Sequence, residues 1–475
     1  MSSSALRWSF AQQLARQFFS IAIYLALAKL LSPVDFGLVG IAAIWISIGT
    51  LFIDSGFSTA LIQKKDVSDR HLNSVFVLNV VFGVTMFALI YFSAPLLSAS
   101  YGEPALTDIL RVMAISILFT AVASTKVSLA QKTLEFRLLT FRDIIAVTIG
   151  GSVGLIAAFS ELSVWSLVFQ AVVTSIVLFV VTWNIVDWKP SISNISLNSI
   201  RDLWGYSSKI FTFGLLKFVS QNIDLILIGF LLGPSAVGLY GFASKTVITP
   251  ISSIRAAFGA YLFPRFSIIQ DRPDVLVAEY THAIKRVGYL VTPILLVAYF
   301  FVEEAVLLVF GSKWIGAIPL IKVIAFVALM QSLIAPIGEL IKAIGRPELL
   351  VWWGIGFTFA SVVFIYLGTE WQLMGVALAL GLVHLGGVLA CILISSSLLN
   401  VGLPVMVRAY IIPLSMFVAL VLLGNLIGPI FNSLVPFASL MTLCVLLALN
   451  VVLLRVFDPV FFKGLRFSGR TDRND

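Results

Sequence analysis

The sequence predicts an all-α polytopic membrane protein with about 14 transmembrane helices, arranged as two parallel six-helix bundles and two additional C-terminal helices. Composition is the first reason: 60% of the residues are hydrophobic, 11% are charged and the mean hydropathy is +1.05, whereas soluble domains carry about 25% charged residues. The second reason is a succession of apolar runs, each close to the ~20 residues that cross a bilayer. The third is a phrase that occurs twice, about 200 residues apart, as in a duplicated bundle.

Polar residues, prolines and glycines separate the apolar runs and set the bounds of the expected spans. The first half contains residues 10–31, 37–62, 72–97, 107–130, 143–160 and 163–183. The second half contains residues 208–232, 237–263, 286–310, 316–341, 350–368 and 372–397, and the additional pair is 405–427 and 435–457. We therefore expect an N-terminal six-helix bundle at residues 1–200, a C-terminal six-helix bundle at 201–400, and two further helices with a basic cytoplasmic tail at 401–475.

Lysine and arginine gather in alternate connections, and such connections stay cytoplasmic. The basic connections and tail hold Lys64, Lys65, Arg70, Lys126, Lys132, Arg137, Arg142, Lys189, Arg201, Lys209, Arg265, Arg272, Lys285, Arg286, Lys342, Arg346, Arg408, Arg455, Lys463, Arg466, Arg470 and Arg473. The opposite connections carry acids instead: Asp35, Glu103, Asp108, Glu161, Glu303, Glu304 and Glu370. This asymmetry places both termini in the cytoplasm. The net charge of +8 therefore indicates topology and contact with anionic lipid, and we expect no nucleic-acid partner.

The repeated phrase predicts how the two bundles are oriented relative to each other in the membrane. Leu31–Ala42 returns as Leu232–Ala243, with the same leucine, proline, glycine, leucine, glycine and alanine at corresponding positions. Six spans separate the copies, so the halves run parallel and a pseudo-twofold axis along the membrane normal relates them. Proline starts helices well and glycine permits close helix contact, so we interpret the phrase as architectural rather than chemical.

Charged residues inside the spans are the candidate functional residues, because an ionised group within the bilayer is costly and usually faces a cavity or a partner. The cations are Arg16, Lys29, Arg111, Lys217, Lys245 and Lys322, and the acids are Asp54, Asp224 and Glu339. An excess of cations suits a cavity that holds a diphosphate or acidic sugars. The substrate-binding candidates are Arg16, Lys29, Lys217, Asp224 and Lys245, and the ion-coupling candidates are Asp54 and Asp224.

Several of these residues have a structural alternative. Arg16, Lys29, Arg111 and Lys322 could extend to the membrane interface. Lys217 and Asp224 lie seven residues apart on one helix face and could form an internal ion pair.

Asp54 lies in the sequence Ile53-Asp-Ser-Gly56, where a half-broken helix would expose its carboxylate to water. It is a candidate proton or sodium site, or a partner for Lys29 or Arg16. Glu339 and Lys342 are one turn apart and are expected to pair locally. For His384, a neutral packing role is favoured over a proton relay.

No metal-ligand spacing, phosphate-binding loop or nucleophile motif is visible in the sequence. We therefore expect no cofactor, no metal and no catalytic residue. A membrane-embedded saccharide polymerase or ligase would need convergent catalytic groups and commonly a large outer loop, and the outer connections here are too short for one, so this class is disfavoured.

Nearly the whole chain resembles the multidrug/oligosaccharidyl-lipid/polysaccharide (MOP) exporter superfamily, in its branch of WzxC-like lipopolysaccharide and exopolysaccharide flippases. The residues that carry the resemblance are Ala28-Lys-Leu-Leu-Ser-Pro33 with Phe36-Gly37, Asp54-Ser-Gly-Phe57 with Ala60-Leu-Ile-Gln63, Asn222-Ile-Asp224 with Ile228-Gly229, and Gly238-Leu-Tyr240 with Ala243, Lys245 and Pro250.

The resemblance implies a flippase of the bacterial cytoplasmic (inner) membrane. Such a protein moves an undecaprenyl-diphosphate-linked oligosaccharide repeat unit between leaflets by alternating access, for exopolysaccharide or lipopolysaccharide biosynthesis. Its implied partners are this substrate, membrane lipids, and a polysaccharide polymerase with export machinery. The alternative is a cation-coupled small-molecule antiporter of the same superfamily, which usually has twelve spans.

Overall fold

The computed structural model describes residues 19–54, 56–191, 194–432, 443–450 and 452. All regular structure in these residues is helical, and ten of the helices are long and apolar enough to cross a membrane. Two of the ten, Leu197–Ile269 and Glu348–Leu399, each contain two of the expected spans. Helices at Phe19–Leu30 and 443–450 are the described parts of the first and last expected spans. The predicted all-α polytopic membrane fold is therefore confirmed.

The chain forms two compact units, each of which is described by itself. The N-terminal unit extends to Gly241 and also includes Val309–Lys313, and the C-terminal unit comprises Phe242–Leu308 and the residues from Trp314 onward. The domain boundaries expected at residues 200 and 400 stay a prediction. Arg16, part of the 435–457 segment and all the cations of the basic tail lie outside the described residues.

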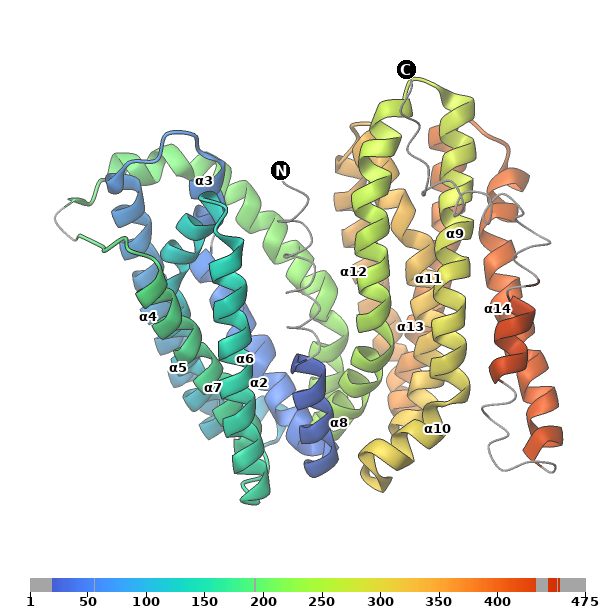
Figure 1. The fold of residues 1–475 in the computed structure, drawn as a ribbon, viewed down its shortest axis with the longest axis horizontal. Helices are drawn as coiled ribbons and strands as arrows, with labels where there is room; N and C mark the ends of the chain where they lie inside the picture. Colours follow the sequence, from blue (N-terminus) through green and yellow to red (C-terminus); the bar gives the residue numbers. More distant parts are fainter. Residues whose placement is uncertain (1–18, 55, 192–193, 433–442, 451, 453–475) are drawn as a thin grey trace. The chain divides into compact units, whose positions relative to one another are not determined.

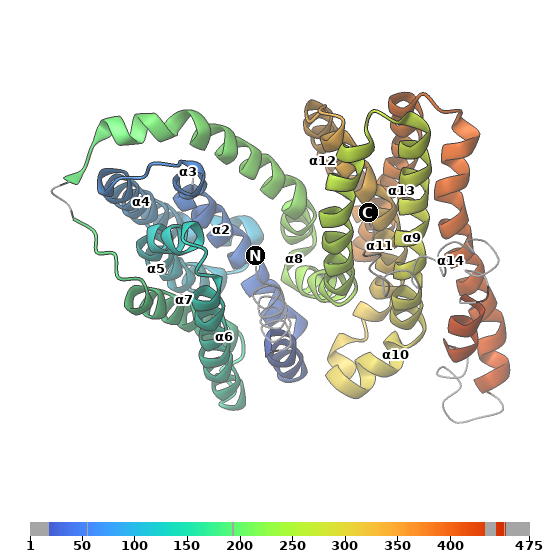
Figure 2. The same cartoon turned by 45° about the horizontal axis from the view of Figure 1, so that its top comes forward.

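In the N-terminal unit, a helix at Phe19–Leu30 precedes α2 (Pro33–Asp54), α3 (Phe57–Gln63), α4 (Asp69–Tyr101), α5 (Leu106–Lys132), α6 (Phe136–Phe159) and α7 (Trp165–Ile185). The closest packing joins α4 to α5, α6 to α7, and α5 to both α2 and α7, as Figure 1 shows. The first part of α8 (Leu197–Ile269) crosses the ends of α3 and α4 (Figure 2). There the carboxylate of Asp202 accepts a hydrogen bond from Lys64 Nζ at 2.6 Å and contacts His71 Nε2 at 3.2 Å.

The C-terminal unit contains the second part of α8, then α9 (Pro273–Phe300), α10 (Val302–Ala305), α11 (Ala317–Ala343), α12 (Glu348–Gly368), α13 (Gln372–Leu399) and α14 (Leu403–Asn432). A short η segment lies at Thr369–Trp371, and two more, at Val306–Phe310 and Ser312–Trp314, overlap the Val309–Lys313 stretch that belongs to the N-terminal unit. Helix α11 packs against α9 and α13, and α9 packs against α14. The fully buried Trp314 stacks on Phe242 with ring centroids 4.2 Å apart, which anchors the start of α11 to α8.

The first copy of the repeated phrase begins with a capped helix. Ser32 precedes α2, and the Asp35 carboxylate accepts hydrogen bonds from its backbone N–H at 2.8 Å and its hydroxyl at 2.6 Å. The Ser163 hydroxyl adds a third bond at 2.6 Å, so Asp35 is buried with its charge satisfied. The second copy has no such cap. There Gly233 interrupts α8 with φ 80° and ψ −178°, which separates the expected seventh and eighth spans.

Within the N-terminal unit, the proline and glycine residues of the two copies of the phrase pack against each other. A methyl group on Gly37 would overlap the carbonyl of Pro234, and a methyl group on Gly238 would overlap the carbonyl of Pro33. Each copy therefore supplies the glycine that lets the proline turn of the other copy approach. Close helix contact at the glycines, which the architectural interpretation of the phrase predicted, is confirmed.

Two lysines of the basic connections cap helices instead of facing solvent. Lys126 on α5 is 1% exposed, and its Nζ donates to the carbonyls of Trp183 at 3.0 Å and Val186 at 2.7 Å, at the carboxyl end of α7. The same ammonium lies 4.4 Å from the ring centroid of Trp183. Lys132 donates to the carbonyls of Leu61 and Lys64 at the end of α3. A cation at a helix carboxyl end satisfies orphan carbonyls and complements the helix dipole.

Candidate functional site

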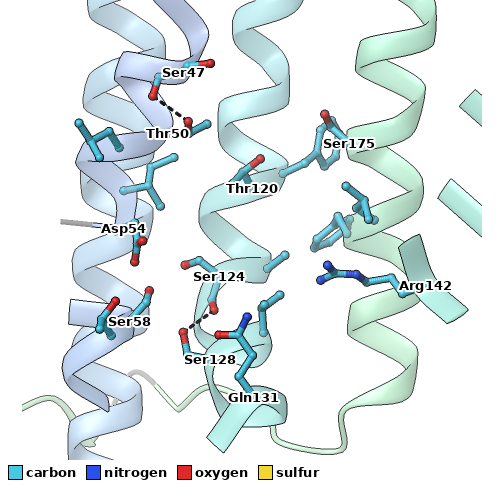
Figure 3. A pocket seen from close by; sticks show the side chains of 18 of the residues that line it. Ser47, Thr50, Asp54, Ser58, Thr120, Ser124, Ser128, Gln131, Arg142 and Ser175 are labelled. Atoms are coloured by element: carbon cyan, nitrogen blue, oxygen red, sulfur yellow. Dashed lines mark hydrogen bonds between the residues drawn. The ribbon is translucent and has the colours of Figure 1, made fainter. Parts of the chain in front are cut away.

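A polar cavity of about 520 Å³ lies inside the N-terminal unit, between α2 and α3 on one side and α5, α6 and α7 on the other (Figure 3). Most of its polar lining groups are hydroxyls: Ser47, Thr50, Ser58, Thr59, Thr120, Ser124, Ser128 and Ser175. The volume falls within the roughly 300–1,000 Å³ of small-molecule sites. Polar groups gathered within a helix bundle of a membrane protein mark a place for a polar ligand or water.

Asp54 is the last residue of α2, and its side chain lines this cavity. Helix α3 begins at Phe57, and between the two helices Gly56 adopts φ 76°. A side chain at Gly56 would overlap the backbone carbonyl of Ser207, so this break requires glycine. The half-broken helix predicted at Ile53–Gly56 is confirmed. The carboxylate of Asp54 is exposed toward the cavity, and within the described residues no ion pair joins it to Lys29.

Arg142 lies on the wall opposite Asp54 (Figure 3). Its guanidinium donates to Asp143 Oδ1 from Nε at 3.0 Å and from Nη2 at 2.7 Å, and to Thr182 Oγ1 from Nη1 at 3.3 Å. The Asp143 carboxylate therefore balances the charge of Arg142 and fixes the direction of the guanidinium. Among the described residues that line the cavity, Asp54 and Arg142 are the charged ones.

The remaining wall is amphipathic. Phe119 on α5 and Phe179 on α7 both line the cavity, with ring centroids 5.5 Å apart. Gln131 lies near the carboxyl end of α5, and within the described residues its side-chain amide has no hydrogen-bond partner. The site thus combines hydroxyls, an amide and aromatic rings with little net charge.

The substrate-binding candidates lie elsewhere. Lys29 is exposed near the end of the Phe19–Leu30 helix, and Lys217 is exposed on α8. The carboxylate of Asp224 accepts hydrogen bonds from the Tyr240 hydroxyl and the Leu225 backbone N–H, both at 2.9 Å. Within the described residues, Lys217 and Asp224 form no ion pair. Lys245 belongs to the C-terminal unit.

The predictions for the Glu339–Lys342 pair and for His384 can both be compared with the C-terminal unit. Lys342 Nζ donates to Glu339 at 2.8 Å, so the predicted local pair is confirmed. His384 is 7% exposed, and its Nδ1 donates to the carbonyl of Leu380 at 2.8 Å. Its Nε2 lies 3.0 Å from the Gln331 amide nitrogen and accepts a hydrogen bond from it, so the ring is neutral. The predicted packing role of His384 is confirmed.

Arg111 and Lys322, which could extend to the interface, each lie over an aromatic ring. The Arg111 guanidinium is 5.0 Å from the centroid of Tyr91, and Lys322 Nζ is 5.7 Å from the centroid of Tyr299. Each residue is near the start of its helix, α5 and α11 respectively. Cation–π contact provides each charge with a partner at that position.

Sequence reasoning missed most of the cavity. Its criterion was intramembrane charge, and isolated serines and threonines in apolar helices carry none. Helical spacing is the signal that could have found them, because Thr120, Ser124 and Ser128 recur every four residues and so share one face of α5. Arg142 was assigned to the topology signal alone.

Comparison with known proteins identifies the family. The chain is 27% identical to the teichuronic acid biosynthesis protein TuaB of Bacillus subtilis (strain 168) over 308 residues, and this alignment covers 64% of each chain. It is 23% identical to the lipopolysaccharide biosynthesis protein WzxC of Escherichia coli (strain K12) over 350 residues, and this alignment covers 72% of this chain and 70% of WzxC. The lipid II flippase MurJ, in an inward closed conformation, has the same fold, with a TM-score of 0.75 at 13% identity over 95% of this chain and 100% of that one. Residues 26–319 match the family described as "Polysaccharide biosynthesis protein", and the chain belongs to this family.

Proposed function

We propose that this multi-pass membrane protein is a flippase that moves a lipid-linked oligosaccharide repeat unit from the cytoplasmic to the outer leaflet of a bacterial inner membrane. The observation that carries the proposal is the hydroxyl-lined cavity of about 520 Å³ within a membrane bundle of the polysaccharide biosynthesis family. Such a cavity shelters sugars from the hydrocarbon core while a polyprenyl tail stays in the bilayer. TuaB and WzxC are named for the biosynthesis of teichuronic acid and lipopolysaccharide, and MurJ is named as a flippase of lipid II, which supports a lipid-linked saccharide as the cargo.

The mechanism that we propose is alternating access. The cavity loads the saccharide on the side with the basic connections, which we place in the cytoplasm with both termini. The candidate residues for holding the diphosphate are Lys29 and Lys217 of the N-terminal unit, Lys245 of the C-terminal unit and Arg16, which lies outside the described residues, and Asp224 is the candidate for orienting neighbouring groups. A polysaccharide polymerase and export machinery then take the product.

Proteoliposome assays of lipid-linked saccharide translocation test the cation assignment. We expect Lys217→Ala, Asp224→Ala and Lys245→Ala each to slow translocation about tenfold, because each removes roughly one charge-assisted interaction worth 1.5–3 kcal/mol. Lys65→Ala, in the exposed connection between α3 and α4, is the matched control and should keep the wild-type rate. Wild-type rates in all three site variants would rule out these residues as the diphosphate site.

A second assay tests Asp54 as the coupling carboxylate. We expect Asp54→Asn to abolish the acceleration of translocation by an imposed proton or sodium gradient, because the amide neither binds a proton nor attracts a cation. The rate without a gradient should change little. Asp66→Asn, on an exposed connection, should respond to the gradient as the wild type does. A gradient response that persists in Asp54→Asn would exclude this residue.

A cation-coupled small-molecule antiporter is the second candidate, because the Asp54 carboxylate lies in a cavity rich in hydroxyl oxygens and could receive an organic cation. Counterflow of such a cation across proteoliposomes, with no translocation of lipid-linked saccharide, would favour it. A polymerase or ligase is a poorer candidate, since the fold neighbour is named as a flippase.

A further inference from the structure

We infer that the cavity of the N-terminal unit binds uncharged sugar residues of the lipid-linked saccharide through hydroxyl-to-hydroxyl hydrogen bonds, and that the diphosphate is held outside it. This inference rests on the proposed function and names which part of the cargo occupies the cavity. It also specifies the kind of sugar, since acidic substituents would be disfavoured there.

The directions of the hydrogen bonds define the cavity wall. Five lining hydroxyls donate their single proton to carbonyls three or four residues earlier in their own helices, at 2.9 to 3.1 Å: Thr50, Thr120, Ser124, Ser128 and Ser175. A hydroxyl has one donor and two acceptor positions. These groups therefore present acceptor lone pairs to the cavity, and Ser124 already uses one to accept from Asn79 at 2.7 Å.

These five acceptor hydroxyls favour a ligand that donates hydrogen bonds. Sugar hydroxyls carry a proton each and can donate to every one of these oxygens. Diphosphate and carboxylate oxygens only accept, so at these five positions they would meet unpaired lone pairs, and they would also meet the charge of Asp54. Among the described lining residues Arg142 is the one cation, and Asp143 already binds it at 2.7 Å.

The other lining groups suit the same ligand. The rings of Phe119 and Phe179 offer apolar surface to the C–H faces of a sugar ring. The Gln131 amide can both donate to and accept from hydroxyls. The cavity thus supplies apolar faces between polar groups, as a saccharide does.

Binding measurements with two lipid probes in nanodiscs test the inference. One probe is a short polyprenyl diphosphate that carries a neutral hexose trisaccharide, and the other is the same diphosphate without sugar. The double variant Thr50→Val/Thr120→Val removes two acceptors and keeps the side-chain shape. We expect it to weaken binding of the sugar-bearing probe by about tenfold, because two hydrogen bonds are lost, and to leave binding of the sugar-free probe unchanged.

Thr85→Val is the matched control, because Thr85 also donates to a carbonyl of its own helix, that of Val81 at 2.8 Å, but is exposed on α4 outside the cavity. It should bind both probes as the wild type does. Unchanged affinity of the double variant for the sugar-bearing probe would overturn the inference. So would equal weakening for both probes, equal wild-type affinity for both, or displacement of the sugar-bearing probe by tetraphenylphosphonium.

Translocation of the sugar-bearing probe in proteoliposomes separates the two proposals. Wild-type translocation with binding that does not depend on the two hydroxyls would contradict this inference alone. Hydroxyl-dependent binding without any translocation would contradict the proposed flippase function alone.

Discussion

Substitution of Gly37 or Gly238 by alanine should destabilise the protein by about 3 kcal/mol or more. The added methyl group would overlap a backbone carbonyl, that of Pro234 or of Pro33, and a carbonyl cannot rotate away as a side chain can. The crossing of α2 and α8 would have to separate, and its surrounding packing would be lost. Thermal unfolding in detergent, followed by size-exclusion chromatography, measures the effect.

Gly354→Ala on α12 is the control for this experiment, because its added methyl group would meet no atom of the described residues within 4 Å beyond its chain neighbours and the backbone of its own helix turn. In a helix that change should stabilise by up to about 1 kcal/mol, so the two kinds of variant should shift the melting temperature in opposite directions. A wild-type melting temperature in Gly37→Ala would show that the two copies of the phrase do not pack as described.

Substitution of Lys126 by methionine should cost about 2–4 kcal/mol of stability. Methionine fills a similar volume, but it leaves the carbonyls of Trp183 and Val186 without their donor at the buried end of α7. It also removes the cation from the face of Trp183. The melting temperature should fall, and protease cleavage near residues 186–191 should increase, since the end of α7 loses its anchor.

Lys65→Met removes the same charge from the same side of the bundle at an exposed position. It should leave the melting temperature within error of the wild type. Equal stability of Lys126→Met and Lys65→Met would show that Lys126 contributes only to topology.

The fold was largely predictable because hydrophobic run length and turn residues encode membrane spans directly. The breaks at Gly233 and at Gly56 were both visible, since each glycine interrupts an apolar run at a point where the chain must change direction. The sequence predicted that glycines such as Gly37 and Gly238 permit close helix packing. The residues that these glycines contact, Pro234 and Pro33, were not predictable, because a repeated sequence does not show which residues of the two copies meet.

The site was less predictable, for a physical reason. Charge inside an apolar segment is conspicuous, so Asp54 could be singled out from the sequence. A serine that bonds its own helix costs little within a bilayer and leaves hydropathy almost unchanged, so Ser124 and Ser175 could not. Lys126 and Arg142 were interpreted as topology cations because the sequence does not show which helix end or carboxylate a long side chain will reach.

The N-terminal unit is discontinuous, and this has a consequence for biosynthesis. Val309–Lys313 belongs to it, and Lys313 Nζ donates to the carbonyl of Leu30 at 3.1 Å. When residues 1–241 have been synthesised, the N-terminal unit is therefore still incomplete, because Val309–Lys313 is synthesised later. A nascent chain arrested before residue 309 therefore lacks the hydrogen bond from Lys313 to Leu30, and its N-terminal helices can be compared with those of the complete chain.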